Sequence, residues 1–432
     1  MSEEDPIAAN GVVGAGGAGF PAAVKLSGHA GTFIVNAAEC EPLMHKDAEL
    51  IVHRRDELME GLKTAMDRTG AKEGVIGIKE KHREVIDSLR GCLPPRVRLH
   101  PLSDTYPAGD EFLLVRDVTG RIVPPGGLPL HVGAIVSNVE TLVNVGTGKP
   151  VTAKFLTVAG AVMNPVTLSV PVGTSVADCI KAAGGAAVAD YLVLVGGVMM
   201  GRPVTGPEEP VVKTTGGLVV LPVDHPLARR HARTAAQAKR IGRSACDQCS
   251  FCTELCPRYL LGHPIAPHVA MRALGFAVPE AGMVDGVLYC SECNLCSLFS
   301  CPEGLDPRQE CVAGKIAARE KGLKWAGDPA ALRPHGLFEH RRVPVKRLMT
   351  RLGLARFADK GPLIREPLKI SRVVIPLKQH AGVPAEALVR VGQQVASGET
   401  IGRIPAGKIG GHVHASISGR VTAVNGAVTI EA

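Results

Sequence analysis

Eight of the twelve cysteines in this 432-residue chain fall into two short runs, each ending in Cys-Pro. The runs read Cys246-x2-Cys249-x2-Cys252-x3-Cys256-Pro257 and Cys290-x2-Cys293-x2-Cys296-x4-Cys301-Pro302. Three cysteines at this spacing wrap one corner of an iron–sulfur cube, while the fourth, before proline, ligates the other cluster. The spacing therefore predicts two [4Fe–4S] clusters. One would be held by Cys246, Cys249, Cys252 and Cys301, and the other by Cys290, Cys293, Cys296 and Cys256.

Zinc sites and disulfides also use closely spaced cysteines. A third cysteine in register and the Cys-Pro of each run favour clusters over zinc. The N-terminal stretch MSEEDPIAAN lacks the basic-then-apolar pattern of a signal peptide, so we expect a reducing bacterial cytoplasm or a compartment within it. The second run has one extra residue before Cys301, at Phe299-Ser300, and departs there from the pattern of the first.

Length and composition limit the class of protein. A chain this long should form roughly three or four domains. Aromatic residues make up only 3% of it, so the cores must consist of Val, Leu, Ile and Ala. No apolar stretch is long enough to span a bilayer. Two oxidised clusters of about −2 each would offset part of the net charge of +8. Aromatic residues interleaved with Lys and Arg are absent, so we expect no nucleic-acid partner.

The first domain, residues 1–150, alternates short apolar strands with helical stretches. Strands are expected at Phe33–Val35, Val75–Ile78 and Val97–Leu99, and helices at 45–68 and 80–90. That alternation predicts an α/β layer with a largely parallel sheet.

Residues 151–225 follow a different pattern, strand–strand–helix–strand–strand. The strands are expected at 155–161, 166–170, 191–195 and 218–221, with a helix beginning at Thr174 or Ser175. This order predicts a small β-grasp domain.

The remainder divides into three segments. A basic helix over 226–245 leads into a double-cluster helical domain at 226–325. Residues 326–369 are rich in Pro and Arg and resemble a linker with one amphipathic helix near 343–356. Short glycine-separated strands over 370–432 predict a barrel or sandwich similar to biotinyl carriers but without the carrier lysine.

The stretch Gly14-Ala15-Gly16-Gly17-Ala18-Gly19 matches G-x-G-x-x-G but lacks the strand that should precede a dinucleotide fingerprint. Glycines still allow backbone N–H groups to approach a phosphate, and Lys25 follows on an expected helix. The alternative is a glycine-rich turn that binds nothing.

Four motifs in order resemble the flavin-binding domain shared by the NADH-oxidising subunit of complex I and RnfC-like proteins. They are GAGGAGFPAAVK (14–25), NAAECEP (36–42), YPAGDE (106–111) and SNVETL (137–142). The family's β-grasp (SLBB) and double-cluster domains follow in the same order as here. The resemblance therefore implies a multidomain fold: flavin/NADH-binding α/β, SLBB, ferredoxin-like double cluster, and C-terminal barrel-sandwich hybrid.

The resemblance also implies which residues bind the flavin mononucleotide (FMN) and NADH. Gly14, Gly16 and Lys25 would hold the flavin phosphate, with Asn138 and Thr141 closing that side. Asn36, Glu39 and Tyr106 would meet the ring or ribityl chain, and Glu41 and Glu111 would contact the nicotinamide nucleotide. Ala38 and Asp110 depart from the complex I pattern, which has an acidic residue at the first position and a glutamate at the second. No side chain is expected to act as a covalent or acid–base catalyst.

The C-terminal position of the sandwich resembles the cobalamin-reductase branch of this family, found in propanediol-utilisation microcompartments. That resemblance implies an oxidoreductase passing electrons from NADH through FMN and two [4Fe–4S] clusters to cobalamin, in support of a cobalamin-dependent diol dehydratase. Expected partners are an acceptor protein or corrinoid, with a microcompartment shell or a cobalamin adenosyltransferase as further candidates. One alternative is a relay subunit at the inner membrane that serves an ion pump or another dedicated reductase. The other is a cluster-only ferredoxin-like module.

Several residues outside these motifs also bear on function. The lone cysteines Cys40, Cys92, Cys179 and Cys311 are expected to be packed thiols. His412 and His414, two apart on an expected strand, would share one face and are candidates for a metal or corrinoid contact, the alternative being ordinary hydrogen-bonded histidines.

Overall fold

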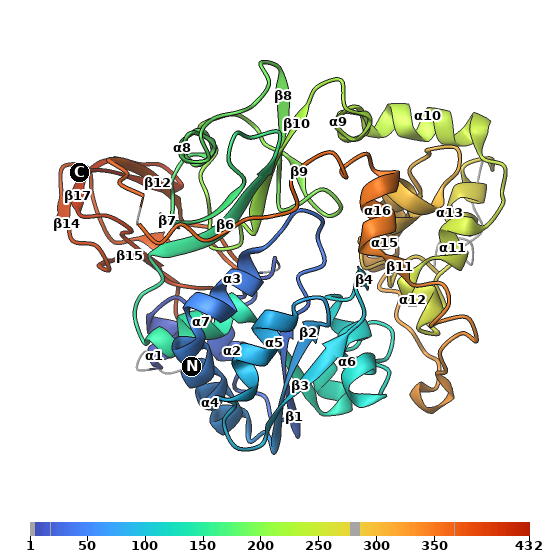
Figure 1. The fold of residues 1–432 in the computed structure, drawn as a ribbon, viewed down its shortest axis with the longest axis horizontal. Coiled ribbons are helices and arrows are strands. Elements are labelled where there is room, and N and C mark those ends of the chain that lie inside the picture. Colours follow the sequence, from blue (N-terminus) through green and yellow to red (C-terminus); the bar gives the residue numbers. More distant parts are fainter. Residues whose placement is uncertain (1–4, 18, 277–285, 367) are drawn as a thin grey trace.

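The computed structural model describes residues 5–17, 19–276, 286–366 and 368–432. Ala18 of the glycine loop lies outside the described residues. The chain forms an α/β layer, a mixed sheet, a helical region and a C-terminal β unit, which follow one another along the sequence (Figure 1).

The N-terminal region is built on a parallel four-stranded sheet with strand order β3-β2-β1-β5. The strands are β1 (Thr32–Ala37), β2 (Glu73–Lys79), β3 (Val97–Leu102) and β5 (Ala134–Asn138). The helices around it are α1 (Pro6–Ala9), α2 (Ala22–Lys25), α3 (Lys46–His53), α4 (Arg55–Thr69), α5 (Arg83–Arg90), α6 (Glu111–Thr119), η1 (Pro129–Val132) and α7 (Val139–Thr147). The single helix expected at 45–68 is in fact two helices, because Arg54 leaves helical geometry at φ −131°.

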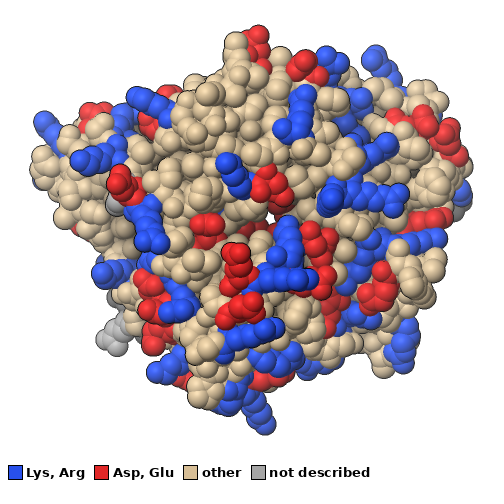
Figure 2. Space-filling model, viewed as in Figure 1, with Lys and Arg blue, Asp and Glu red and all other residues tan. Residues whose placement is uncertain are grey.

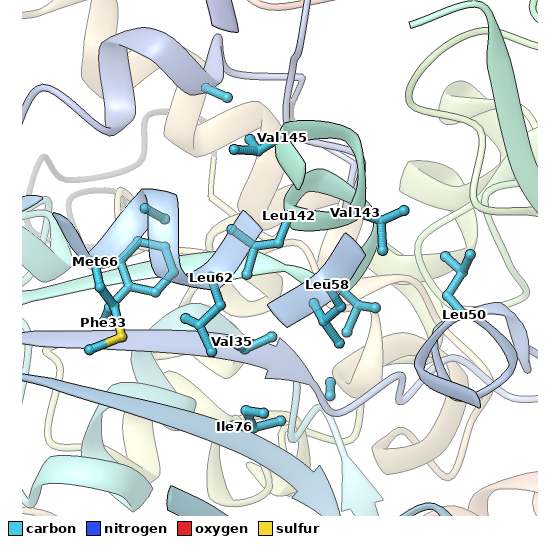
Figure 3. Close-up of a cluster of buried hydrophobic side chains, with 14 of the residues drawn as sticks. Phe33, Val35, Leu50, Leu58, Leu62, Met66, Ile76, Leu142, Val143 and Val145 are labelled. Atoms are coloured by element: carbon cyan, nitrogen blue, oxygen red, sulfur yellow. The ribbon is translucent and has the colours of Figure 1, made fainter. Parts of the chain in front are cut away.

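The main core of this region lies between α4, α7 and the sheet. Leu58 and Leu62 of α4 face Leu142 of α7 and the apolar side chains of β1 and β2 (Figure 3). Two glycines bring the helices into backbone contact: a Cβ on Gly61 would lie 1.9 Å from the carbonyl oxygen of Leu142. Gly146 makes the reciprocal approach to α4. This packing fixes α7, whose first residues belong to the fourth motif.

The second region is a five-stranded sheet with order β7-β6-β10-β8-β9 and one helix, which is a β-grasp arrangement. Its elements are β6 (Ala153–Gly160), β7 (Val166–Pro171), α8 (Val176–Ala182), β8 (Tyr191–Val195), β9 (Arg202–Pro203) and β10 (Gly217–Pro222). Ser175 caps α8 by accepting a hydrogen bond from the Asp178 amide.

The cysteine-rich region is helical. It contains α9 (Pro226–His231), α10 (Ala235–Ala245), α11 (Phe251–Glu254), α12 (Pro257–Leu260), α13 (Pro267–Ala273), η2 (Cys296–Ser300) and α15 (Pro307–Glu320). The expectation of one basic helix over 226–245 is wrong, because Thr234 and Gln237 form a capping box that starts a new helix.

The segment after α15 returns to the first domain. It forms η3 (Pro329–Ala331), the short strand β11 (Val343–Pro344) and α16 (Val345–Arg351). β11 pairs antiparallel with β4 (Thr105–Tyr106), so this segment is docked along the third motif.

The C-terminal unit consists of two sheets around one apolar core. One contains β12 (Arg372–Pro376), β14 (Gln394–Val395), β17 (Gly419–Val424) and β18 (Ala427–Glu431). The other contains β13 (Glu386–Ala387), β15 (Thr400–Arg403) and β16 (Val413–His414).

Charged side chains of both signs are interspersed on the face shown in Figure 2, so the net positive charge is not gathered there into one band. Among the described residues, no helix is both long and apolar enough to cross a membrane.

Candidate electron-transfer site

The sheet order creates a switch point between β1 and β5. From β1 the chain builds outward through β2 and β3, then returns to place β5 on the other side of β1. Ligands of open parallel sheets bind at the carboxyl ends of the strands where the order reverses. Asn36 and Asn138 are register partners near these two ends. The second and fourth motifs therefore leave the sheet side by side.

The glycine loop lies against the start of α7. The Ala15 amide donates to Thr141 Oγ1 at 2.9 Å, and a Cβ on Gly16 would lie only 3.3 Å from the Cβ of Asn138. Gly17 has φ +122°, a conformation that other residues rarely adopt. A glycine loop packed on a helix N-terminus is a cradle for a phosphate-bearing ligand, and the residues present fit the phosphate of FMN.

The third motif reaches the same edge. Asn36 Nδ2 donates to the Gly109 carbonyl at 2.9 Å, and Lys25 Nζ forms an ion pair with Glu111 at 2.9 Å. Both members of that pair are about one-third exposed, so water screens the attraction between them. The structure thus brings together Gly14, Gly16, Lys25, Asn36, Glu111, Asn138 and Thr141 at one edge of the sheet.

A buried charge network underlies Glu39. The Glu39 carboxylate accepts the Asp47 amide at 2.9 Å, and Asp47 accepts from Asn138 Nδ2 at 2.8 Å. Burial, with the nearby Asp47 carboxylate, raises the pKa of Glu39 to about 7. The network continues through the buried residues Lys46, Glu140 and Lys154. Sequence reasoning missed these three and Asp47. The only signal in the sequence was position, since Lys46 and Asp47 follow the second motif and Glu140 lies within the fourth.

Glu41 has a different environment from the one expected for a nicotinamide contact. Its carboxylate oxygens accept the backbone amides of Met199 at 3.0 Å and Met200 at 2.8 Å, in the β8–β9 loop. A Cβ on Gly197 would lie 2.5 Å from Glu41 Oε2, so that glycine is needed for the approach. Glu41 therefore joins the first domain to the β-grasp domain, with both carboxylate oxygens occupied.

Tyr106 points to the cysteine-rich region. Its ring is buried, and its hydroxyl donates to the backbone carbonyl of Cys293 at 2.7 Å. A second connection lies nearby: Arg258, two residues after Cys256, pairs with Asp110 at 2.9 Å and covers the Phe112 ring at 3.7 Å. The third motif thus contacts the loops that carry two cysteines of the second expected cluster set.

The eight cysteines of the runs surround two separate cavities. Cys246, Cys249, Cys252 and Cys301 line one of them. The other is lined by Cys256, Cys290, Cys293 and Cys296. Each cavity therefore receives three cysteines from one run and the last cysteine of the other. Four thiols around one space fit a [4Fe–4S] cube. We call the sites the outer cluster site (Cys246 set) and the inner cluster site (Cys290 set).

Both runs use the same unusual backbone turn. Gln248 and Ser250 flank Cys249 with φ of +57° and +64°, and Glu292 and Asn294 flank Cys293 with φ of +63° and +65°. Left-handed geometry is unfavourable for such residues and persists only where the surrounding structure requires it. The repeat of this turn at equivalent positions indicates that the two loops wrap equivalent objects.

The extra residue before Cys301 is absorbed by a π-turn. Residues Cys296–Ser300 form a single π-helical turn, closed by a hydrogen bond of 3.1 Å from the Cys301 amide to the Cys296 carbonyl. In the first run, the Cys256 amide bonds instead to Thr253, three residues back. A π-turn accommodates one inserted residue, so Cys301 still reaches the outer cluster site.

The thiols need a compensating positive charge. Burial raises the pKa of Cys252 to about 12, and the other thiols of its set, Cys301 first, add to the increase. The iron of a bound cluster would supply that charge and keep the ligands as thiolates. Backbone amides assist at two positions, from Glu292 to Cys290 Sγ at 3.3 Å and from Leu305 to Cys301 Sγ at 3.4 Å.

The remaining cysteines differ in burial, and Cys40 and Cys92 are half-buried. Cys179 and Cys311 are fully buried, and a hydrogen bond from Cys311 lowers the pKa of Cys290 to about 7. His412 Nδ1 accepts the Ile404 amide at 3.2 Å, and His414 is buried. In the described part of the chain, no group of three or more His, Cys, Asp or Glu side chains is arranged to hold a single metal ion.

Comparison with known proteins agrees with this architecture. Family models match along the chain in the expected order: the Nuo51 FMN-binding domain (7–147), the SLBB domain (155–203), a 4Fe-4S dicluster domain (245–306) and the RnfC barrel sandwich hybrid domain (357–432). The fold class and the FMN and [4Fe–4S] cofactors predicted from the sequence are therefore confirmed. The chain is an iron–sulfur flavoprotein.

Curated relatives give the particular family. Cobalamin reductase PduS of Salmonella typhimurium is 44% identical over 428 residues, covering 97% of this chain and 94% of that protein. PduS of Citrobacter freundii is 42% identical over 97% of this chain and 93% of its own length. A component of the Na(+)-translocating ferredoxin:NAD(+) oxidoreductase complex of Acetobacterium woodii is 33% identical over 58% of this chain and 56% of its own length. The chain belongs to the PduS family of cobalamin reductases.

Proposed function

We propose that this protein transfers electrons from NADH through FMN and two [4Fe–4S] clusters to cobalamin. The observation that carries the proposal is the continuous arrangement of a flavin cradle, the inner cluster site and the outer cluster site in one chain. The 44% sequence identity to PduS, over 97% of this chain, supports cobalamin as the acceptor. Relatedness to a component of a ferredoxin:NAD(+) oxidoreductase complex supports a nicotinamide donor.

The proposed flavin site uses the residues gathered at the switch point. Backbone amides of the glycine loop and the ammonium of Lys25 hold the phosphate, and Thr141 and Asn138 fix the loop beneath it. Asn36 and Glu39 would meet the flavin ring or ribityl chain, and Glu111 pairs with the phosphate-binding Lys25. Glu41 and Tyr106 position neighbouring domains, because their polar atoms are committed to Met199, Met200 and Cys293.

In the proposed electron route, the flavin passes its electrons first to the inner cluster, and the outer cluster exchanges electrons with the inner one. NADH delivers two electrons as hydride, and a bound flavin accepts the pair and releases them singly. The inner site is first because Tyr106 and Asp110 contact the loops of Cys293 and Cys256. One NADH and two Co(II) then give NAD⁺, one proton and two Co(I).

An anaerobic assay of the reconstituted full chain tests the proposal. NADH should reduce cob(II)alamin to cob(I)alamin, with two corrinoids reduced per NADH. The Lys25→Ala variant should retain less flavin, while Lys63→Ala, an exposed lysine on α4, should not change flavin content. If flavin and both clusters are loaded and NADH yields no cob(I)alamin, the cobalamin assignment fails and the relay alternative is favoured.

The cellular setting belongs to the same proposal. We place the protein in a bacterial microcompartment, with shell proteins and a cobalamin adenosyltransferase as partners, on the strength of the PduS relationship. Retention with purified microcompartments tests this. Recovery with membrane proteins of an ion pump instead would support the relay alternative.

A further inference from the structure

A wide groove lies between the first domain and the cysteine-rich region, away from the flavin cradle. Its volume is about 1150 Å³, larger than the roughly 300–1000 Å³ typical of small-molecule pockets. One wall is the 120–132 loop before β5, and the other is formed by α15 and the segment through η3, drawn in orange in Figure 1.

The groove is cationic. Arg121, Arg319, Lys324 and Arg333 line it together with His131, and none of the described residues that line it is Asp or Glu. Within the described residues, no ion pair is found for any of these four cations. Arg121 instead donates to Thr32 Oγ1, and Arg333 to the carbonyls of Ala330 and Leu332. Four exposed cations, with no carboxylate beside them in the described part of the groove, attract an anionic or amide-rich ligand.

The groove also offers flat apolar surface. Trp325, the single tryptophan of the chain, and Tyr289 both line it. The Tyr289 ring lies over Gly126, where a Cβ would approach it to 3.4 Å. Aromatic faces of this kind contribute large contact area while polar groups beside them fix orientation.

The groove is adjacent to the inner cluster site. Tyr289 immediately precedes Cys290, a cysteine of that site. On α15, Lys315 donates to the Cys290 carbonyl at 2.7 Å, and Arg319 lies one turn further along the same helix face. A ligand in the groove is therefore next to the loop of a cluster ligand.

The groove and the flavin cradle lie at opposite ends of strand β1 of the parallel sheet. Arg121 contacts Thr32, the first residue of β1, whereas Asn36 near its other end belongs to the cradle. Those residues are four apart, about 13 Å at roughly 3.3 Å per residue. A nicotinamide stacked on the flavin would approach from the carboxyl ends of the strands, where the cradle lies. The groove therefore serves another ligand.

We infer that this groove is the corrinoid-binding site, an inference that rests on the proposed function. A corrinoid is bulky enough for the volume, presents a broad ring to Trp325 and Tyr289, and carries amide carbonyls and a phosphate for the cations. The cobalt receives one electron from the inner cluster, which converts Co(II) to Co(I) with no bond transfer to the protein.

Groove variants of the reconstituted full chain test the inference. Arg319→Gln/Lys324→Gln and Trp325→Ala should each raise the Kd for cob(II)alamin, measured by anaerobic equilibrium dialysis, about tenfold or more, and should raise KM more than they lower kcat. Trp325→Phe should restore most of the affinity. Lys63→Gln/Arg390→Gln removes the same charge from exposed positions elsewhere and should leave Kd unchanged. NADH-dependent reduction of benzyl viologen should stay at the wild-type rate in every variant.

A comparison of two corrinoids distinguishes recognition of the phosphate from recognition of the corrin ring. If the cations hold the phosphate, the Arg319→Gln/Lys324→Gln effect should be larger for cobalamin than for cobinamide, which lacks the nucleotide loop. If the wild type reduces cobalamin and the groove variants match its Kd and KM, the groove inference alone is overturned. Selective loss of ADP binding with unchanged cobalamin binding would also overturn it. A wild type that reduces benzyl viologen but not cobalamin would instead refute the proposed function.

Discussion

The buried hydroxyl of Tyr106 donates a 2.7 Å hydrogen bond to the backbone carbonyl of Cys293. One partner belongs to the third flavin-domain motif and the other to the inner cluster site. On the next residue, the Asn294 side chain donates to the Met199 carbonyl, and Met199 in turn donates its amide to Glu41. Three domains therefore meet at the turn that flanks a cluster ligand.

The Tyr106→Phe variant should weaken this connection while preserving the ring packing. Loss of one buried hydrogen bond should cost about 1 kcal/mol of unfolding free energy. Flavin reduction by NADH should proceed at the wild-type rate, whereas reduction of the clusters, followed by stopped-flow absorbance, should slow several-fold. Tyr191→Phe, at a side chain 41% exposed, is the matched control. Equal slowing of flavin and cluster reduction would contradict a role at the junction.

Cysteine substitutions should separate the two cluster sites. Cys249→Ser and Cys301→Ser should remove the same electron paramagnetic resonance signal, and Cys293→Ser and Cys256→Ser should remove the other. Iron should fall from about eight to about four atoms per chain in each case. The grouping would be wrong if Cys301→Ser removed the signal lost in Cys293→Ser.

Sequence reasoning was strongest where spacing alone determines chemistry. The two cysteine runs predicted the dicluster domain, since their spacing is a direct geometric requirement of the cube. The π-turn before Cys301 was visible only as an extra residue, because whether an insertion bulges or shifts the helix depends on packing. The contacts of Glu41 and Tyr106 could not be predicted, since their partners lie 158 and 187 residues away. Lys46 and Lys154 were missed for the same reason: only the fold makes them buried.

The pair of Arg258 and Asp110 should stabilise the junction far more than surface pairs do. Both side chains are about nine-tenths buried, and Asp110 also caps α6 through the Phe112 and Leu113 amides. Removing the cation in Arg258→Ala leaves a buried carboxylate unpaired, which should cost roughly 3 kcal/mol by denaturant unfolding.

Two comparisons decide whether that cost arises from the unpaired charge. Asp110→Asn retains the helix cap, so Asp110→Asn/Arg258→Met should recover part of the loss of Arg258→Ala. Arg90→Ala, which breaks an exposed pair with Asp87, should change stability by less than about 1 kcal/mol. A loss in Arg258→Ala no larger than in Arg90→Ala would refute the argument.

Glu41 should make stability depend on pH between about 4.5 and 7. Burial raises the pKa of Glu41 from its ordinary 4.5 to about 7, against the opposing effect of the Met199 and Met200 amides. In this window the folded protein binds a proton that the unfolded chain has released, so the free energy of unfolding falls as pH rises. Glu41→Gln removes that contribution. The stability of the wild type relative to this variant should therefore decrease by on the order of 2 kcal/mol from pH 4.5 to pH 7. Glu208→Gln, at a side chain 74% exposed, should show no such trend. If the stability difference between the wild type and Glu41→Gln did not change with pH, the Glu41 carboxylate would be ionised throughout this range.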